Sequence, residues 1–288
     1  MSNNIRYAKK YTRFLNEAYA AKAAAACLEA DRSLIREGAN AHELVIPRLT
    51  ADGLADYSRG AGYTRGGVNL SWDTVSFNYE RGRMFEVDVL DDAETQGIAF
   101  GRLASEFMRT RAIPEADAFK FAQLAAGAGN TEAAAITGGE AAIAAIRAGT
   151  AMLDDEDVPY EDRYLFVSHK VKGLIDDLDI TKSKAVLDRF VKVVTVPQSR
   201  FFDGIELLDG TSEGEEAGGF RKAEGASDLN FLIVHRPSSL IFTKYEVTKI
   251  ISPDSNPDAD AWRYAYRCAG IAEVLPGKAK GIYAHTAV

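Results

Sequence analysis

Acidic residues are the part of this sequence whose spacing most suggests chemistry. The run from Asp154 to Asp157 could hold a cation, but it lacks the alternating ligands and the central glycine of a calcium loop. Asp91, Asp92 and Glu94 could form a carboxylate pair for acid–base catalysis. Acids are also favourable at the first turn of a helix, where the helix dipole attracts negative charge. We interpret the first group as a solvated helix end and the second as a helix start capped by Asp92.

Other residues that commonly carry catalysis show no functional spacing. Gly127 and Gly129 end a predicted helix, whereas a dinucleotide site needs glycines that open one. Cys27 and Cys268 stand far apart, which is typical of buried thiols in a reducing compartment. The histidines are scattered through the chain: His42, His169, His235 and His285. No protease, hydrolase, P-loop or kinase signature occurs, so we predict no enzyme activity, no cofactor and no metal.

Composition limits the class of protein. The 288 residues are 47% hydrophobic and 26% charged, as in ordinary globular proteins of one elaborate domain or two modest ones. A net charge of -8 argues against a chain that wraps nucleic acid, because that role needs clustered Lys and Arg. No apolar run approaches the ~18 residues of a membrane span.

The elements that would position a site begin with an arm and a hairpin. Thr12 to Glu37 is rich in alanine, which predicts a helix that docks on another surface. Glu43 to Leu49 is predicted as a strand that ends near Pro47. The segment from Thr50 to Gly67 contains five glycines, which predicts a flexible hairpin tip.

The second half of the hairpin alternates apolar and polar residues. Val68, Leu70 and Trp72 alternate with polar neighbours, which predicts a half-buried strand. The phase shifts at Thr74, which suggests a bulge or a strong twist. We expect the hairpin strands to extend to Leu90, with a long helix directly behind them.

That helix is predicted from Asp92 to about Arg111, and Pro114 is expected to restart a second helix. Its apolar face repeats with helical spacing at Phe100, Leu103, Ala104, Phe107 and Met108. After residue 127 the pattern becomes mixed. Helices are expected at 138–153 and up to 174, strands at 164–168, 191–196, 231–234, 240–251 and 281–285, a surface loop at 209–228, and a strand or helix at 264–275.

Tyrosine, tryptophan and arginine are enriched in protein interfaces. Arg81 and Arg83 could contact phosphate, but arginine also forms bidentate bonds with carboxylates, so we expect them to pair with acids of a neighbouring molecule. The full set of predicted intersubunit contacts is Tyr57, Arg59, Tyr63, Arg65, Trp72, Arg81, Arg83, Arg102 and Arg109.

Three motifs together resemble the major capsid proteins of tailed bacteriophages, in the branch common among phages of Gram-positive bacteria. They are GLADYSRGAGYTRGGVNLSWDT, YERGRMFEVDVLDDAET and SEFMRTRAIPEADAFKFAQLA. The C-terminal half agrees through VVTVPQSRF, LNFLIVHRPSSLIFTK and WRYAYRCAGIAEVLPGKAKGIYAH. The resemblance covers nearly the whole chain.

The resemblance implies an α+β chain with the Hong Kong 97-like capsid fold. Residues 1–41 would form an N-terminal arm with its helix, and residues 42–90 an extended loop that lies across a neighbouring subunit. Residues 91–131 and 237–288 would form a peripheral domain with a long spine helix. Residues 132–236 would form an axial domain whose tips meet at the centre of a capsomer.

The function so implied is that of a structural major capsid protein. It would assemble with itself into pentamers and hexamers of an icosahedral head that encloses double-stranded DNA. Its other partners would be a portal protein, a decoration protein in some heads, and the packaged DNA through non-specific contact, with no membrane. It would be located in the virion and assembled in the host cytoplasm.

Two departures from some family members refine this expectation. No lysine occurs between Lys22 and Lys120, so the loop cannot donate a lysine to a covalent link, and we predict a non-covalent shell. The arm begins almost at Met1, so we expect a separate scaffolding protein. A basic cluster in the arm faces either the lumen or acids of an adjacent subunit: Arg6, Lys9, Lys10 and Arg13.

Two other interpretations remain open. An encapsulin, which is the shell protein of a bacterial cargo compartment, has the same fold, and neighbouring genes would distinguish the two. A stand-alone enzyme with a lid-like loop would need convergent catalytic groups, which the sequence does not show.

Overall fold

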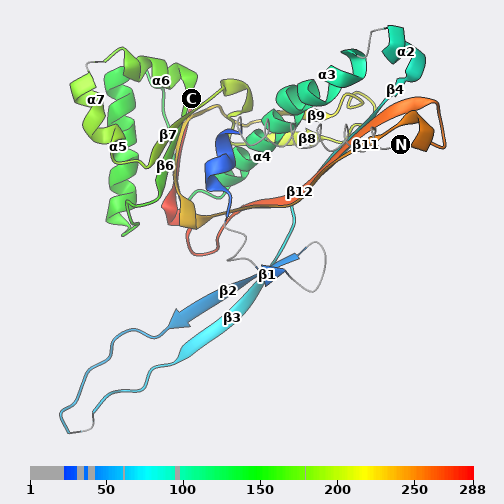
Figure 1. Ribbon diagram of the computed structural model, residues 1–288. Helices are drawn as coiled ribbons and strands as arrows, with labels where there is room; N and C mark the ends of the chain where they lie inside the picture. Colours follow the sequence, from blue (N-terminus) through cyan, green and yellow to red (C-terminus); the bar gives the residue numbers. More distant parts are fainter. Residues whose placement is uncertain (1–22, 31–35, 38–42, 61, 95–97, 179) are drawn as a thin grey trace.

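The computed structural model describes residues 23–30, 36–37, 43–60, 62–94, 98–178 and 180–288. Figure 1 shows a body of helices and sheets from which a narrow two-stranded arm extends. Among the described residues, no helix combines the length and the apolar character that crossing a membrane requires.

One end of the body is a five-stranded sheet with helices beside it (Figure 1). Its strand order is β5 (Asn130–Ala133), β13 (Ile282–Thr286), β10 (Leu229–His235), β6 (Arg163–Ser168) and β7 (Lys192–Val196). The central strand β10 runs antiparallel to both neighbours, whereas the outer pairs β13–β5 and β6–β7 are parallel. The adjoining helices are α5 (Gly139–Asp155), α6 (His169–Asp176) and α7 (Ile180–Leu187).

Both faces of this sheet are buried, which explains the continuous apolar runs of its central strands. Leu165 and Ile233 pack in a cluster with residues of α5 and α6. Phe166 and Leu232, one position along each strand, pack in a second cluster that includes Phe121 of α4 (Ile113–Ala126). The sheet therefore lies between two hydrophobic cores.

The spine is a helix with a π turn rather than two separate helices. It comprises α3 (Ile98–Phe107), a π-helical segment η3 (Met108–Ala112) and α4, and the backbone keeps helical angles at Phe107 and Ala112. The predicted restart at Pro114 is therefore wrong. Pro114 has no N–H to bond the carbonyl four residues earlier, and the wider π turn directly before it accommodates that loss.

The start of the helical region also differs from the prediction. A short helix α2 covers Val89–Glu94, so Asp92 lies inside a helix and does not cap one. Asp91 and Asp92 occupy the first turn of α2, where acids are favourable. Gly127 follows the last residue of α4, as predicted for a helix stop.

Beneath the spine lies an antiparallel sheet of three strands (Figure 1), in the order β11 (Ser239–Ile251), β12 (Ala261–Val274) and β4 (Tyr79–Asp88). The ambiguous segment 264–275 is thus a strand. The prediction that the hairpin strands extend to Leu90 is wrong, because β4 pairs with β12 of the body.

The arm consists of β2 (Glu43–Ala51) and β3 (Val68–Ser76), with the short strand β1 (Arg36–Glu37) beside β2. Its register is unbroken from Glu43 opposite Ser76 to Ala51 opposite Val68, so the predicted bulge at Thr74 is absent there. Strand β2 continues through Pro47 because β1 pairs only with Val45 and Leu44. Proline is tolerated on such an outer edge, where its missing N–H breaks no ladder bond.

The predicted N-terminal helix is wrong over its described part. Ala24–Leu28 forms a 3₁₀ helix and Arg36–Glu37 a strand, while residues 12–22 and 31–35 lie outside the described residues. Tertiary contacts override the helix propensity of alanine here. The expected loop 209–228 is also wrong in part, since β9 (Gly219–Lys222) pairs with β8 (Ile205–Leu208). The remaining 3₁₀ turns are Gln198–Arg200, Arg236–Ser238, Pro253–Ser255 and Ala279–Gly281.

Candidate functional site

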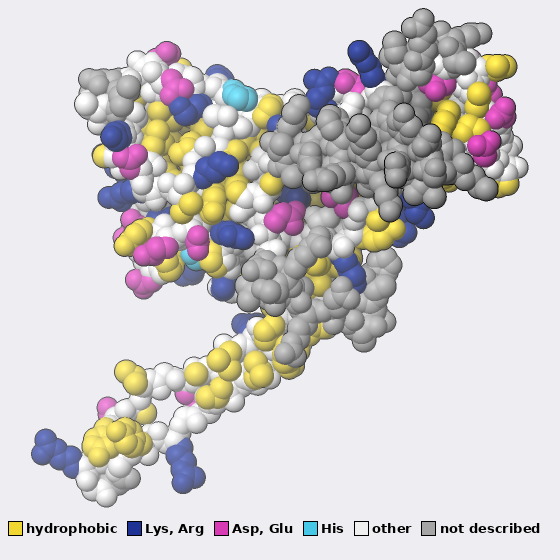
Figure 2. Space-filling model, in the orientation of Figure 1, with side chains coloured by type: hydrophobic (Ala, Val, Ile, Leu, Met, Phe, Trp, Pro, Cys, Tyr) yellow, Lys and Arg dark blue, Asp and Glu magenta, His cyan; other side chains and the backbone are white. Residues whose placement is uncertain are grey.

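The arm carries an apolar surface that the body does not cover. Directly opposite residues of an antiparallel pair share one face, and the pairs here are apolar. We call this surface the apolar face of the arm; it comprises Pro47 with Trp72, Leu49 with Leu70, and Ala51 with Val68. Leu49 is 67% exposed, Leu70 54% and Trp72 49%. Figure 2 shows hydrophobic side chains running along the arm.

The opposite face of the arm is polar over the same length. Arg48 pairs with Ser71 and Thr50 pairs with Asn69. An isolated two-stranded hairpin is marginally stable at best in water, and a contiguous exposed apolar patch marks an interaction site. The arm is therefore amphipathic without a core of its own, as expected of a segment that packs on another molecule.

The tip of the arm forms a hydrogen-bonded turn. The Ser58 N–H donates to the Gly62 carbonyl at 3.2 Å, and the Gly62 N–H donates to the Ser58 carbonyl at 2.7 Å. Gly62 has a φ of +80°, a backbone conformation that glycine adopts readily. The Tyr57 and Tyr63 rings contact each other across this turn, with centroids 4.9 Å apart.

The predicted interface residues of the arm are accessible. Tyr57, Arg59, Tyr63 and Arg65 are exposed at the tip, and Trp72 is exposed on the apolar face. Because tyrosine and arginine dominate interface hot spots, the pre-formed tip is suited to binding. Their contact with a neighbouring subunit stays a prediction.

The root of the arm is fixed to the body by apolar packing. Leu44 is fully buried against Leu240, Phe242 and Ile271 of the three-stranded sheet. Other side chains from both sides pack around this cluster: Ile46, Val75, Phe77 and Leu275. Val75 thus points opposite to the exposed Trp72, which explains the phase shift in the sequence.

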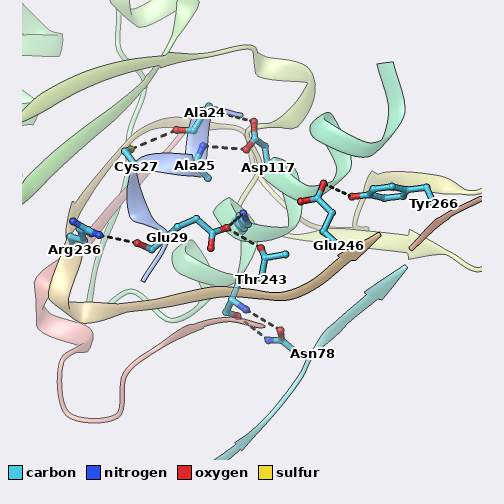
Figure 3. A network of polar contacts seen from close by, with 12 residues as sticks. Ala24, Ala25, Cys27, Glu29, Asn78, Asp117, Arg236, Thr243, Glu246 and Tyr266 are labelled. Atoms are coloured by element: carbon cyan, nitrogen blue, oxygen red, sulfur yellow. Dashed lines mark hydrogen bonds and ion pairs between the residues drawn. The ribbon is translucent and has the colours of Figure 1, made fainter. Parts of the chain in front are cut away.

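A two-point amide contact completes the root. Asn78 donates from Nδ2 to the Ala272 carbonyl at 2.8 Å, and its Oδ1 accepts from the Ala272 N–H at 3.1 Å (Figure 3). This contact joins residues 194 positions apart in the sequence. It ties the segment between β3 and β4 to β12, and no local pattern in the sequence predicts it.

The N-terminal segment is held by a buried carboxylate of the spine. Asp117 is 1% exposed and accepts hydrogen bonds from the Ala24 N–H at 2.9 Å and the Ala25 N–H at 3.2 Å (Figure 3). Arg200 lies 3.1 Å from the same carboxylate. These contacts satisfy the first amides of the 3₁₀ helix, which otherwise lack partners.

Glu29 forms the second contact of this segment. Its Oε1 accepts from Lys120 Nζ at 2.8 Å and from Thr243 Oγ1 at 3.0 Å, and its carbonyl accepts from Arg236 at 2.9 Å. The Ala30 N–H donates to the Ile241 carbonyl at 2.7 Å. Residues 24–30 therefore connect the spine to β11, close to the root of the arm.

Arg81 and Arg83 have partners inside the chain. Arg81 Nε lies 2.6 Å from Glu115 Oε1, and its Nη2 donates to the Leu208 carbonyl at 2.8 Å. Arg83 donates to the Glu216 carbonyl at 3.0 Å. Both arginines thus tie β4 to the β8–β9 hairpin. We interpreted them from sequence as partners of acids on a neighbour, and any such contact stays a prediction.

The other predicted residues divide into two groups. Arg102 and Arg109 are exposed on the spine, and Arg109 pairs with Glu106 at 2.7 Å. The four basic residues near the N-terminus lie outside the described residues: Arg6, Lys9, Lys10 and Arg13.

Among the residues that could take part in catalysis, Asp154 is engaged in an ion pair and the cysteines are at least partly buried. Asp154 near the end of α5 pairs with the buried Arg163 at 2.7 Å. Burial raises the pKa of Cys268 to about 11 and also raises the pKa of Cys27, which favours the protonated thiol over the nucleophilic thiolate. Within the described part of the chain, no cluster of His, Cys, Asp and Glu is arranged to hold a metal ion.

Comparison with known proteins reveals the fold. No protein-family model and no curated protein matches the chain. Solved structures do match, among them the mature capsid of bacteriophage PhiM1, at 15% identity, a TM-score of 0.56, and coverage of 86% of this chain and 82% of that one. The capsid of Myoviridae phage XM1 matches at 11% identity, a TM-score of 0.56 and 88% of both chains.

A virus-like particle from Pyrococcus furiosus also matches, at 9% identity, a TM-score of 0.59, and coverage of 97% of this chain and 99% of that one. These likenesses extend over most of the chain, and they agree with the elements described above. The chain therefore has the Hong Kong 97-like fold, which is the fold of the capsid proteins of tailed phages.

Proposed function

We propose that this chain is a capsid shell protein that assembles into the pentamers and hexamers of an icosahedral phage head enclosing double-stranded DNA. The observation that carries the proposal is the uncovered apolar face of the arm on a chain with a capsid fold. Apolar surface of this kind is stabilised only when another molecule removes it from water.

Assembly needs contacts that join each subunit to several neighbours. A head-to-tail contact between unlike surfaces closes into a ring when the rotation permits. The arm reaches far from the body (Figure 1), so one subunit can hold a neighbour at a distance from its own core. Many weak contacts of this kind add up in a closed shell, while an isolated contact still dissociates.

The same proposal assigns the other roles. The chain would reside in the virion after assembly in the host cytoplasm, and it would meet a separate scaffolding protein, a portal protein and, in some heads, a decoration protein. Non-specific contact with packaged DNA would come from basic residues facing the lumen. We propose no catalytic role, no cofactor and no membrane partner.

Electron microscopy of the purified chain, alone and with its scaffolding protein, tests the proposal. Closed shells or ring-shaped capsomers are expected, and a monomer under both conditions would overturn it. Denaturing electrophoresis of mature particles should give single subunits, because the arm has no lysine for a covalent link. A ladder of linked subunits would contradict the non-covalent shell.

The likeness to the virus-like particle from Pyrococcus furiosus, over nearly the full length of both chains, favours a second candidate. The chain would then form an encapsulin-type compartment with protein cargo. Particles from the native source distinguish the two: packaged DNA with portal and tail proteins supports a phage head, whereas enclosed enzyme without DNA supports a compartment.

A further inference from the structure

We propose that a cavity between the spine and the β8–β9 hairpin binds a small aromatic anion, meaning a flat ring that carries one carboxylate or phosphate group. The cavity has a volume of about 380 Å³ and is bounded by β4, the spine with its π-helical segment, and the β8–β9 hairpin. Figure 1 shows β8 and β9 beside the spine. The inference goes beyond the proposed assembly, because it assigns a ligand to the single subunit.

Aromatic rings form much of the cavity wall. Phe85 of β4 and Tyr266 of β12 both meet Phe107 of the spine edge-to-face, with ring centroids 4.9 Å and 5.9 Å from it. Ligand sites in proteins typically have volumes of about 300–1,000 Å³ and mostly apolar walls with a few polar groups. One more ring can extend an edge-to-face cluster and gains more than its buried area alone would give. The cavity therefore fits a flat aromatic ring.

The carboxylates that border the cavity are already bonded within the chain. Glu115 Oε1 lies 2.6 Å from Arg81 Nε, and Glu106 Oε2 lies 2.7 Å from Arg109 Nη2. The Asp209 carboxylate accepts hydrogen bonds from two backbone N–H groups of its own turn, at 2.7 Å and 2.8 Å. Each of these negative charges is thus stabilised before any ligand enters.

Two arginines at the cavity have no carboxylate partner among the described residues. Arg83 donates to the Glu216 carbonyl at 3.0 Å, and the exposed Arg111 forms no hydrogen bond or ion pair with any described residue. A guanidinium group can bind a carboxylate or a phosphate through two parallel N–H bonds. Arg83 and Arg111 therefore provide the positive charge that a bound anion needs.

Glycines of the β8–β9 loop hold the Arg83 guanidinium at the edge of the cavity. A Cβ atom on Gly210 would lie 2.6 Å from Arg83 Nη1, and a Cβ atom on Gly218 would lie 3.6 Å from it. Both glycines have a positive φ, of +77° and +63°, which glycine adopts readily. A side chain at Gly210 would push the guanidinium away, so the loop leaves room for an arginine at this position.

The π-helical segment brings Arg111 to the same cavity. Thr110, Arg111 and Ala112 all border it, although successive residues of a regular α-helix point in directions about 100° apart. Short π-helical segments inside α-helices occur frequently at functional sites. The turn that accommodates Pro114 therefore also places a guanidinium group beside the aromatic wall.

Ligand-observed NMR titration of the full-length, unassembled subunit tests the site with compounds that share one ring system. Naphthoate and naphthyl phosphate carry the anion, and naphthol, which is neutral at neutral pH, is the control. We expect both anions to bind and naphthol to bind at least tenfold more weakly, because it cannot form charge-assisted bonds with a guanidinium group. The tighter anion identifies the source of the natural ligand as an aromatic carboxylic acid or a phosphorylated compound such as a nucleotide. Absence of binding by both anions, or equal binding of naphthol, would overturn the inference.

Arg111→Gln tests the charge, since Arg111 contacts no described residue and its change should leave the fold intact. Binding of both anions should weaken at least tenfold, whereas naphthol binding should stay the same. Arg111→Lys keeps the charge without the fork of N–H groups and should lose less. The matched control is Arg102→Gln, which changes an exposed arginine of α3 that does not border the cavity, and it should bind as wild type does. Unchanged anion binding in Arg111→Gln, or an equal loss in Arg102→Gln, would contradict the assignment.

Ala217→Trp tests the place of binding. Ala217 is exposed on the β8–β9 loop and borders the cavity, so a tryptophan there should fill the space and weaken binding of all three compounds. Unchanged binding in this variant would show that the compounds bind elsewhere, such as on the apolar face of the arm, and would overturn the inference. All of these measurements use single subunits, so their failure would leave the proposed assembly standing, and a failure of assembly would leave the cavity unaffected.

Discussion

The central strands of the five-stranded sheet are continuous apolar runs, whereas the strands of the arm alternate apolar and polar residues, and the two regions have opposite surroundings. Phe166 and Leu232 in the body are fully buried, whereas Leu70 and Trp72 in the arm are about half exposed. Alternating apolar residues thus indicate that one face of a strand is stabilised by burial, and they do not indicate which molecule buries it. The body provides its own cover, and the arm requires a neighbour.

This difference separates folding from assembly in energetic terms. Fully burying a large apolar side chain contributes about 1.5–3 kcal/mol. In the body this contribution appears when the single chain folds. On the apolar face of the arm it appears only when a partner docks, so changes in the two regions should affect different measurements.

The largest effect should come from opening the core of the body. Phe166→Ala removes a ring that contacts Phe121 edge-to-face at 5.1 Å, and the cavity left behind should lower the free energy of unfolding by about 3–5 kcal/mol. Denaturant unfolding of unassembled subunits measures it. A loss below about 1 kcal/mol would show that the body is not the self-sufficient unit inferred here.

Trp72→Ala should weaken assembly and leave the stability of the single subunit almost unchanged. Its removal should weaken each intersubunit contact by about 1.4 kcal/mol or more, which is a tenfold increase in the subunit concentration needed for assembly. Unfolding of the unassembled subunit should change by no more than about 0.5 kcal/mol. Light scattering against concentration and denaturant unfolding measure the two. A large loss of subunit stability with normal assembly would reverse the comparison.

Asn78→Ala acts at the boundary between the two regions. It removes both hydrogen bonds with Ala272, which should cost about 1 kcal/mol and loosen the root. Hydrogen exchange in β2 and β3 should accelerate, while exchange in the five-stranded sheet stays unchanged. The control is Asn69→Ala near the distal end of the arm, and equal acceleration in both variants would contradict a specific role for Asn78.

Lowering the pH should reduce the free energy of unfolding of the body, and we expect this effect to be the smallest of those predicted here. His285 stacks on Phe231 at 4.8 Å, and burial lowers its pKa below the ordinary value of 6.5. The folded chain then binds a proton less readily than the unfolded chain, so this contribution is complete above pH 6.5 and is lost as the pH falls through the folded pKa.

Measuring the unfolding free energy between pH 7 and pH 5 (roughly the range in which histidine titrates) checks this sign. Wild type should fall more steeply than His285→Gln, which cannot titrate there. Parallel curves would exclude His285, leaving His235, whose pKa burial also lowers, as the source of any remaining slope.

Local patterns predicted the elements that have strong periodicity. The central strands near 164–168 and 231–234, helix α5 and the hairpin in outline are where the sequence placed them. Helix propensity predicted an α-helix over Ala24–Leu28, and the structure has a 3₁₀ helix there. Asp117, which is distant in sequence, binds the first amides of that segment. The predicted helix restart at Pro114 was wrong because a π turn accommodates the missing N–H of proline, which no local rule for proline predicts.

The candidate site was predicted by residue type and not by geometry. Tyrosine, tryptophan and arginine in a Gly-rich hairpin indicated an interface; the structure shows these side chains exposed, and their contact with a neighbour stays a prediction. Nothing local distinguished Arg81, whose partners Glu115 and Leu208 are distant in sequence, from the exposed arginines. Asn78 was missed for the same reason, since its partner lies 194 residues away.

Local sequence is enough to show that apolar residues alternate along the second half of a long hairpin and that this hairpin has no lysine for a covalent link. Composition and spacing carry that information because they act between near neighbours. Long-range contacts alone place β4 in the sheet of the body, turn Val75 inward while Trp72 stays exposed, and bring Asn78 against Ala272. Those outcomes depend on contacts between residues far apart in the chain, which local propensities do not encode.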